Sequence, residues 1–255
     1  MCITLQPAKL NNTKILALRI AQDRYFLAYS NKVKNLSGKP NAMILPIPGK
    51  TKPEWFYNTA GYSSFLTEIV KATTVQYRSM SLGRVSKGVS FEQFECGMYN
   101  VGLAVGFDGA DAFINSLPKD KQPEVPQELR DFFKAKYAKD WSFAVCVFDS
   151  DKTTDAQPIA FEFEPAEFEA WPKEALFFPT MDSHDGKAPT ADPVDTDHVF
   201  LFEDKNSTHD KITLQARVPD FLQNRRWQQK TSTGMKPNGD TYIPSVRYGE
   251  LQRKF

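Results

Sequence analysis

Short apolar runs separated by polar turns fill the beginning of the chain. Residues 2–5, 13–20 and 25–33 each have the composition of a β-strand, and Asn-rich or Gln-Asp turns separate them. This pattern predicts an antiparallel meander. Residues 42–47 predict a further strand. Because proline has no amide hydrogen to donate, Pro46 and Pro48 favour either a position at the edge of a sheet or the end of the strand at this point.

The spacing of apolar residues changes after Ser63. Phe65, Leu66, Ile69 and Val70 recur at helical intervals behind the serine, which predicts an amphipathic helix. Residues 108–117 predict a short helix capped by an aspartate, and residues 126–137 predict a longer one with a single apolar side. Residues 221–229 favour a last helix.

The second half of the chain returns to strand patterns. Strands are predicted at residues 141–148, 158–163, 176–178, 199–202 and 211–218, and residues 181–197 have the character of a long acidic loop. Because strands and helices do not alternate strictly, the order predicts an α+β fold built mainly of antiparallel β-sheet with a few packed helices. We expect one domain over residues 1–218 and a basic extension over residues 219–255 that packs on it or mediates contacts.

Composition narrows the class of protein. The chain has 255 residues, of which 41% are hydrophobic and 25% charged, as in an ordinary globular domain. Three cysteines are too few for a disulfide framework and favour a reducing compartment. Neither a membrane-spanning stretch nor the apolar core of a signal peptide is present in the sequence. These features predict a cytoplasmic protein without a membrane partner.

Charge is segregated along the chain. Residues 1–87 contain 13 basic and 3 acidic side chains, whereas residues 149–210 contain 4 basic and 16 acidic ones, although the net charge of the whole chain is only +1. Exposed blocks of opposite sign favour self-association or a charged protein partner. We give more weight to the alternative, in which the basic and acidic blocks face each other within the fold.

The residue after the initiator methionine is the main candidate for catalysis. Removal of Met1 would leave Cys2 with both a thiol and a free α-amine, and the amine can accept the proton of the thiol. Arg19 and Asp23 follow near the end of the next strand and are the predicted companions that orient this nucleophile. The competing interpretation is that Cys2 is a small apolar residue that opens a strand.

A second candidate is a group of imidazoles and carboxylates in the acidic loop. Two of the three histidines are near several aspartates: His184 lies in the loop and His198 lies directly after it, before a strand. We name His184, Asp185 and His198 as candidate metal ligands or acid-base groups. Their spacing matches no known metal signature, and Asp and Gly are also common in turns. The sequence predicts no organic cofactor.

Basic side chains near the N-terminus raise the possibility of an anionic partner. A patch for nucleic acid would draw on the residues Lys9, Lys14, Lys32, Lys34, Lys39, Lys50, Lys52, Arg78, Arg84 and Lys87. The pattern matches no nucleic-acid-binding module, and the acidic middle of the chain would repel phosphate, so a nucleic-acid partner is the less favoured hypothesis.

Two resemblances to known families accompany these patterns. The Met1-Cys2 start, residues 42–48, residues 176–180 with His184-Asp185-Gly186, and Asp197-His198 before a strand resemble a family of uncharacterised bacterial proteins with no assigned activity. The Met-Cys start with Arg19 and Asp23 also partly resembles choloylglycine hydrolases. That resemblance implies an N-terminal nucleophile, for which Arg225 would supply a late arginine, but the chain lacks the glycine and asparagine of the family signature.

Taken together, the sequence favours a non-catalytic binding or assembly protein over an enzyme. The alternative is a cysteine amidohydrolase that uses Cys2. Intact Met1 would block the amine and exclude this mechanism.

Overall fold

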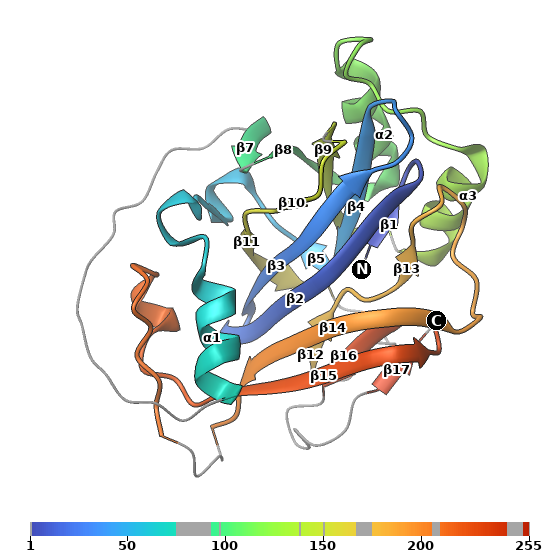
Figure 1. The fold of residues 1–255 in the computed structure, drawn as a ribbon. Coiled ribbons are helices and arrows are strands. Elements are labelled where there is room, and N and C mark those ends of the chain that lie inside the picture. Colours follow the sequence, from blue (N-terminus) through green and yellow to red (C-terminus); the bar gives the residue numbers. More distant parts are fainter. Residues whose placement is uncertain are drawn as a thin grey trace.

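The computed structural model describes residues 2–74, 93–96, 98–137, 139–149, 151–166, 175–205, 210–243 and 252–254. Within these ranges the chain forms three β-sheets and three α-helices (Figure 1). Sheets with mostly antiparallel pairs dominate, which confirms the predicted α+β class. The basic residues from 78 to 87 named above lie outside the described ranges. No helix in the described ranges is long and apolar enough to cross a membrane.

The largest sheet has eight strands. It contains β2 (Ala8–Ala21), β3 (Arg24–Asn35), β5 (Gly49–Lys50), β6 (Phe56–Tyr57), β10 (Thr154–Asp155), β11 (Ile159–Pro165), β14 (Val194–Glu203) and β15 (Trp227–Lys236). Its main path runs β15-β14-β2-β3-β11-β5, with β6 paired to β11 and β10 paired to β3. Neighbouring strands are antiparallel except β14 and β2, which run parallel. The long β2–β3 hairpin is the centre of this sheet.

The second sheet has six strands in the order β13-β1-β4-β9-β8-β7. It contains β1 (Cys2–Thr4), β4 (Asn41–Ile47), β7 (Gln93–Cys96), β8 (Tyr99–Val105), β9 (Ser142–Phe148) and β13 (Asp182–Ser183). A small third sheet is formed by β12 (Leu176–Phe178), β16 (Asp240–Ile243) and β17 (Gln252–Lys254). Parallel pairing of β1 with β13 brings the start of the chain beside the segment around residue 182.

Alternation along β2 explains how the eight-stranded sheet is covered on both faces. Ile15 and Ala17 belong to the core shared with the six-stranded sheet, whereas Leu16 and Leu18 belong to a separate core with α1 (Phe65–Thr74). Successive side chains of a strand point to opposite faces, so the two sets fill two cores. The predicted α1 helix is therefore confirmed, and it closes the outer face.

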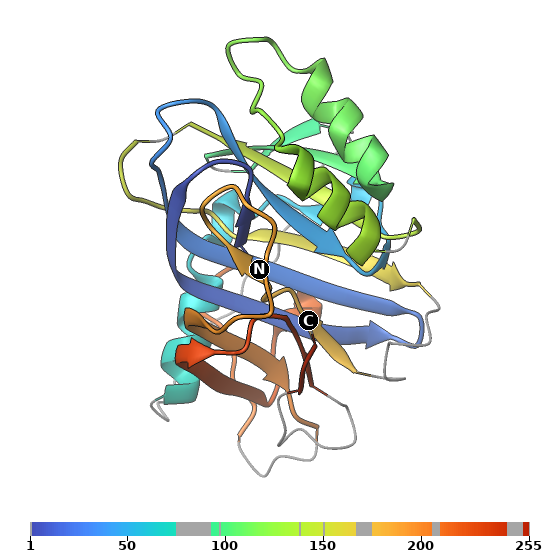
Figure 2. The same cartoon turned by 90° about the vertical axis from the view of Figure 1, so that its right-hand side faces the viewer.

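Two further helices cover the six-stranded sheet. α2 (Gly106–Ser116) and α3 (Gln127–Lys136) place Phe107 and Phe133 against each other and both against Phe143 of β9. The layers are thus α2 and α3, the six-stranded sheet, the eight-stranded sheet, and α1. Figure 2 shows α2 and α3 on the side of the molecule opposite to α1.

Several local predictions were wrong. β4 lies inside its sheet, between β1 and β9, and not at an edge, although it does end at Ile47, immediately before Pro48, as the alternative predicted. Its register with β1 covers Met43 and Ile44, so Pro46 lies beyond that pairing and its missing amide hydrogen breaks no bond to β1. β1 belongs to a different sheet from β2 and β3, so the first three strands do not form one meander. Asp108 lies in the first turn of α2 and not at its cap, which is Val105.

The region after residue 205 also differs from the prediction. Residues 211–218 do not form a strand. Ile212 makes an isolated antiparallel bridge with Arg225. Glu68 of α1 accepts hydrogen bonds from the backbone amides of Gln215 and Ala216, so side chains replace the ladder that a strand would need. The predicted helix over residues 221–229 is a short 3-10 turn (Asp220–Leu222) followed by β15.

Candidate functional site

The strongest concentration of buried polar groups lies where the first strand meets residues 180–190, which we call the strap. Cys2 and Ile3 of β1 pair with Asp182 and Ser183 of the strap. The backbone amide of Ala8 donates to the carbonyl of His184 at 2.8 Å. Gly186 has a φ of +80°, and a Cβ there would lie 2.9 Å from the carbonyl oxygen of Leu5. Glycine is required at this turn because the strap crosses so close to the N-terminal segment.

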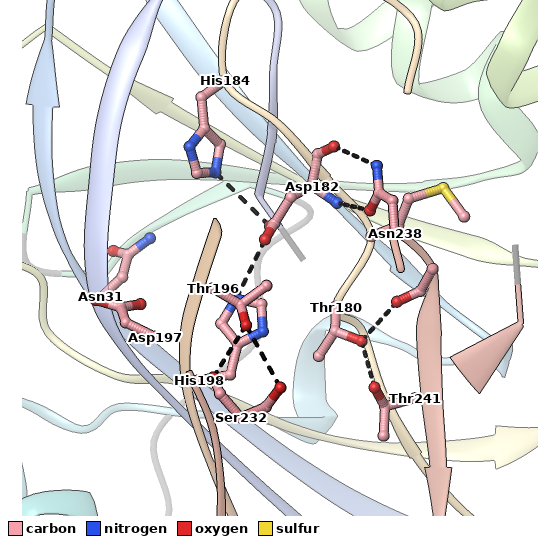
Figure 3. A network of polar contacts seen from close by, with 12 residues as sticks. Asn31, Thr180, Asp182, His184, Thr196, Asp197, His198, Ser232, Asn238 and Thr241 are labelled. Atoms are coloured by element: carbon pink, nitrogen blue, oxygen red, sulfur yellow. Dashed lines mark hydrogen bonds and ion pairs between the residues drawn. The ribbon is translucent and has the colours of Figure 1, made fainter. Parts of the chain in front are cut away.

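A carboxylate flanked by two imidazoles forms the centre of this site. The Nε2 atoms of His184 and His198 lie 3.6 Å and 3.4 Å from the carboxylate oxygens of Asp182. The side chains of Asp182 and His198 are 6% and 2% exposed, whereas that of His184 is 32% exposed. Figure 3 shows the imidazoles approaching the carboxylate from different sides. Both separations are longer than a usual N–H···O hydrogen bond.

Asn238 fixes the backbone of the strap at the same point. Its side-chain oxygen accepts from the amide of Asp182 at 2.8 Å, and its nitrogen donates to the carbonyls of Asp182 and Thr190 at 2.8 Å and 3.0 Å. A neighbouring pair of hydroxyls, Thr180 and Thr241, lies 2.7 Å apart. Figure 3 shows both groups of contacts around the strap. Segments far apart in sequence are thereby joined through buried polar contacts.

Two buried carboxyls in this region have opposite pKa shifts. Burial opposes ionisation of Asp182, but its contacts with His184 and His198 lower the pKa of that carboxyl well below the ordinary value. For Asp240 burial dominates and raises the pKa, although the amides of Thr180 and Met181 donate to the same carboxyl. Asp182 is therefore the anionic group of the site, because two imidazoles flank its carboxylate.

The structure brings together two of the three predicted metal ligands but not the third. His184 and His198 share Asp182, whereas Asp185 accepts from the hydroxyl of Ser183 and the amide of Lys187 in its own turn. In the part of the chain that the structure describes, no three His, Cys, Asp or Glu side chains are placed to hold one metal ion.

Arg19 and Asp23, the predicted companions of Cys2, lie outside this cluster. Arg19 donates to the carbonyls of Ala21 and Gln22 and so stabilises the turn between β2 and β3, where Asp23 is exposed. His198 precedes Val199, which pairs with Lys14, and Arg19 lies five residues further along β2. At about 3.3 Å per residue Arg19 is roughly 17 Å from Lys14 along the strand. The side chain of Cys2 lies outside what the structure describes, so its catalytic role stays a prediction.

Arg225, the predicted late arginine, also makes its contacts outside the cluster around Asp182. Its guanidinium pairs with the carboxylate of Glu203 and donates to the carbonyl of Phe221. These contacts join the end of β14 to the turn before β15.

Comparisons with known proteins were made for the whole chain. No family model and no curated protein matches it. Among solved structures it is similar to baculovirus P35, with 13% identity, a TM-score of 0.50, and coverage of 97% of this chain and 92% of P35. The chain shares the fold of baculovirus P35. P35 in the structure of the caspase-8/P35 complex is also similar, with 13% identity, a TM-score of 0.44, and coverage of 96% and 90%.

The likeness to P35 concerns the fold and assigns no activity to the site. The resemblances noted from the sequence, to uncharacterised bacterial proteins and to choloylglycine hydrolases, are not tested by these matches and stay predictions. The two sequences are 13% identical, which is too low for a comparison of motifs to detect the shared fold.

Sequence reasoning missed the central residue, although a signal for it was present. Asp182 and His184 are two residues apart, and such positions share one face of an extended segment. Asp185, the residue selected from the sequence, has the opposite parity to His184. No sequence signal pointed to Asn238, because its contact with the strap joins residues 56 positions apart.

Replacement of Asp182 by asparagine should lower the stability of the P35-like fold. The buried imidazole of His198 would lose its carboxylate partner, at a cost of about 1–3 kcal/mol in the free energy of unfolding. The folded pKa of Asp182 lies below its ordinary value of 3.8, so its contribution is complete above that pH and disappears as the pH falls through the folded pKa. Chemical denaturation of both proteins between pH 3 and pH 7 measures this difference.

The matched control is Asp185→Asn, which removes one carboxylate from the exposed part of the same turn. It should change the free energy of unfolding by no more than about 0.5 kcal/mol. Equal effects of the two replacements, or a difference that grows on acidification, would show that Asp182 is not an anionic anchor.

Proposed function

We propose that this chain is a non-catalytic protein-binding protein and that a caspase-type protease is the first partner to test. The observation that carries the proposal is the likeness to baculovirus P35 over 97% of this chain and 92% of P35. P35 itself has been solved in complex with caspase-8 and after cleavage by a caspase. The match extends over nearly the whole of both chains, so it concerns the complete fold; a shared fold does not by itself carry a function, and the caspase assay below decides the point.

The polar groups of the candidate site support binding over catalysis. His198, Asp182 and Asn238 are buried and joined to backbone segments, which suits a structural anchor. The arrangement holds the first strand in place beside the strap. β1 itself lies between β13 and β4, with Ile3 and Thr4 buried, so the anchor stabilises the framework of the fold and leaves binding to other, exposed segments.

Self-association and segregated surface charge belong to the same proposal. Basic side chains gather on β2 and β3, whereas the exposed Asp192, Asp195 and Asp197 lie in or beside the start of β14. β14 lies beside β2, so patches of opposite sign adjoin on one sheet. Such a surface favours association with a charged protein or with a second copy of the chain.

The direct test mixes the purified chain with active caspase-8. We expect a stable complex by native mass spectrometry and loss of hydrolysis of a fluorogenic peptide substrate, with baculovirus P35 as the positive control. The chain unfolded by heat serves as the negative control, since binding should need the fold. Full caspase activity together with no complex at micromolar concentrations would remove caspase-8 as a partner.

A second candidate function is a cysteine amidohydrolase that uses Cys2. The observation that favours it is the register of β1, which sets the backbone of Cys2 opposite Asp182, the residue that His184 and His198 flank. The α-amine that is freed by loss of Met1 is the base in this mechanism, and an imidazole held by a carboxylate would orient the thiol and support its ionisation. In this version His184 replaces Arg19 and Asp23 as the helper of Cys2.

Intact mass of the purified protein tests this candidate. The mechanism predicts loss of Met1 and fast labelling of Cys2 by iodoacetamide, which a His184→Gln replacement should slow. Cys146 is buried and serves as the internal reference for an unreactive thiol. Retention of Met1, or labelling of Cys2 at the rate of free cysteine, would contradict it.

A further inference from the structure

Four lysines share one face of the β2–β3 hairpin. Register places Lys9 opposite Lys34, Asn11 opposite Lys32, and Lys14 opposite Ser30. Residues paired in register point to the same side of a sheet. We call the surface formed by Lys9, Lys14, Lys32 and Lys34 the lysine face.

The pair of Lys9 and Lys34 is electrostatically unfavourable. Like charges directly opposite each other on neighbouring strands destabilise a sheet. Neither residue forms an ion pair with any residue in the described part of the chain, and Lys9 is exposed. Folding therefore holds two positive charges together without a partner from the described residues to neutralise them.

The lysine face is open to a partner. α1 covers the other half of the same sheet face, where Leu16, Leu18 and Phe26 lie, and Figure 1 shows it at that end of β2 and β3. The side chain of Lys32 is 40% exposed. Burial lowers the pKa of Lys14, and the neighbouring charge of Lys32 lowers it further.

Two aspartates neutralise part of this charge. Asp155 pairs with Lys32 at 3.6 Å, and the charge of Asp197 acts on Lys14. An excess of positive charge remains around Lys9 and Lys34. From this arrangement we propose that the lysine face binds an extended acidic segment of a protein partner.

The chemistry of the face favours a peptide over a nucleic acid. The lysines extend over residues 30–34 of β3, about 13 Å at 3.3 Å per residue, which suits an extended segment of about five residues. Asp155 and Asp197 at the margin would repel a continuous phosphate backbone, whereas a short segment with a few carboxylates fits between them. Asn11 adds a partly exposed polar side chain, and none of the six residues in these register pairs is aromatic, as stacking on bases would require.

Fluorescence anisotropy with a labelled hexaglutamate peptide at low salt tests the proposal. We expect binding that weakens as salt screens the charges, and no binding of hexaglutamine. Lys34→Glu should weaken binding roughly tenfold, since it removes one favourable charge and adds a repulsive one. The same variant should raise Tm, because Lys9 and the new glutamate attract each other across the strands.

The matched control is Lys121→Glu, an equal change of net charge at an exposed position between α2 and α3. It should leave the affinity for hexaglutamate within about twofold of the original protein, since only screened long-range charge changes. Equal weakening by the two variants would overturn the proposal, as would tighter binding of oligothymidylate than of hexaglutamate. A fall in Tm for Lys34→Glu would contradict the claim that the lysine pair opposes folding. The assay contains no protease, so its outcome is separate from that of the caspase-8 experiment.

Discussion

A buried carboxylate requires partners, and Asp182 obtains them from segments that are distant in sequence. His184 lies in the strap, His198 in β14, and Asn238 in the turn before β16. Burying an ionised aspartate without these groups would cost several kcal/mol, so the three segments must come together for the site to form. The same contacts hold the strap beside β1. The position of the first strand thus depends on groups supplied by the last third of the chain.

The layered architecture makes this closure possible. The β2–β3 hairpin contributes side chains to two cores, one shared with the six-stranded sheet and one with α1. β14 runs parallel beside β2 and carries Phe200 into the first core and Leu201 into the second. His198 lies two residues before Phe200 and therefore faces the same core. The packing of β14 thereby places the imidazole of His198 at the buried edge where the strap and β1 meet.

The patterns that sequence reasoning interpreted well were local. Apolar runs predicted β2 and β3, and helical spacing predicted α1, because those elements bury side chains in a regular period. Pro46 misled the interpretation of β4, since the position of a proline relative to a short neighbouring strand is not visible in sequence. The sequence of residues 211–218 resembles a strand because apolar residues such as Leu214 and Val218 recur in it, and both are buried in the structure. The backbone amides of this segment, however, donate to the side chains of Glu68 and Gln223 and not to a neighbouring strand. Contacts of that kind join distant residues and leave no periodic signal.

The central claim is that the polar contacts of Asp182 anchor the N-terminal strand. Amide hydrogen exchange followed by NMR in a His198→Gln variant tests this most directly. The account predicts that protection falls selectively at Ile3 and Thr4 of β1 and at Ser183 of β13, while Leu27 and Ala28 in the centre of the eight-stranded sheet keep theirs. Unchanged protection in β1 and β13, or an equal loss across both sheets, would contradict it.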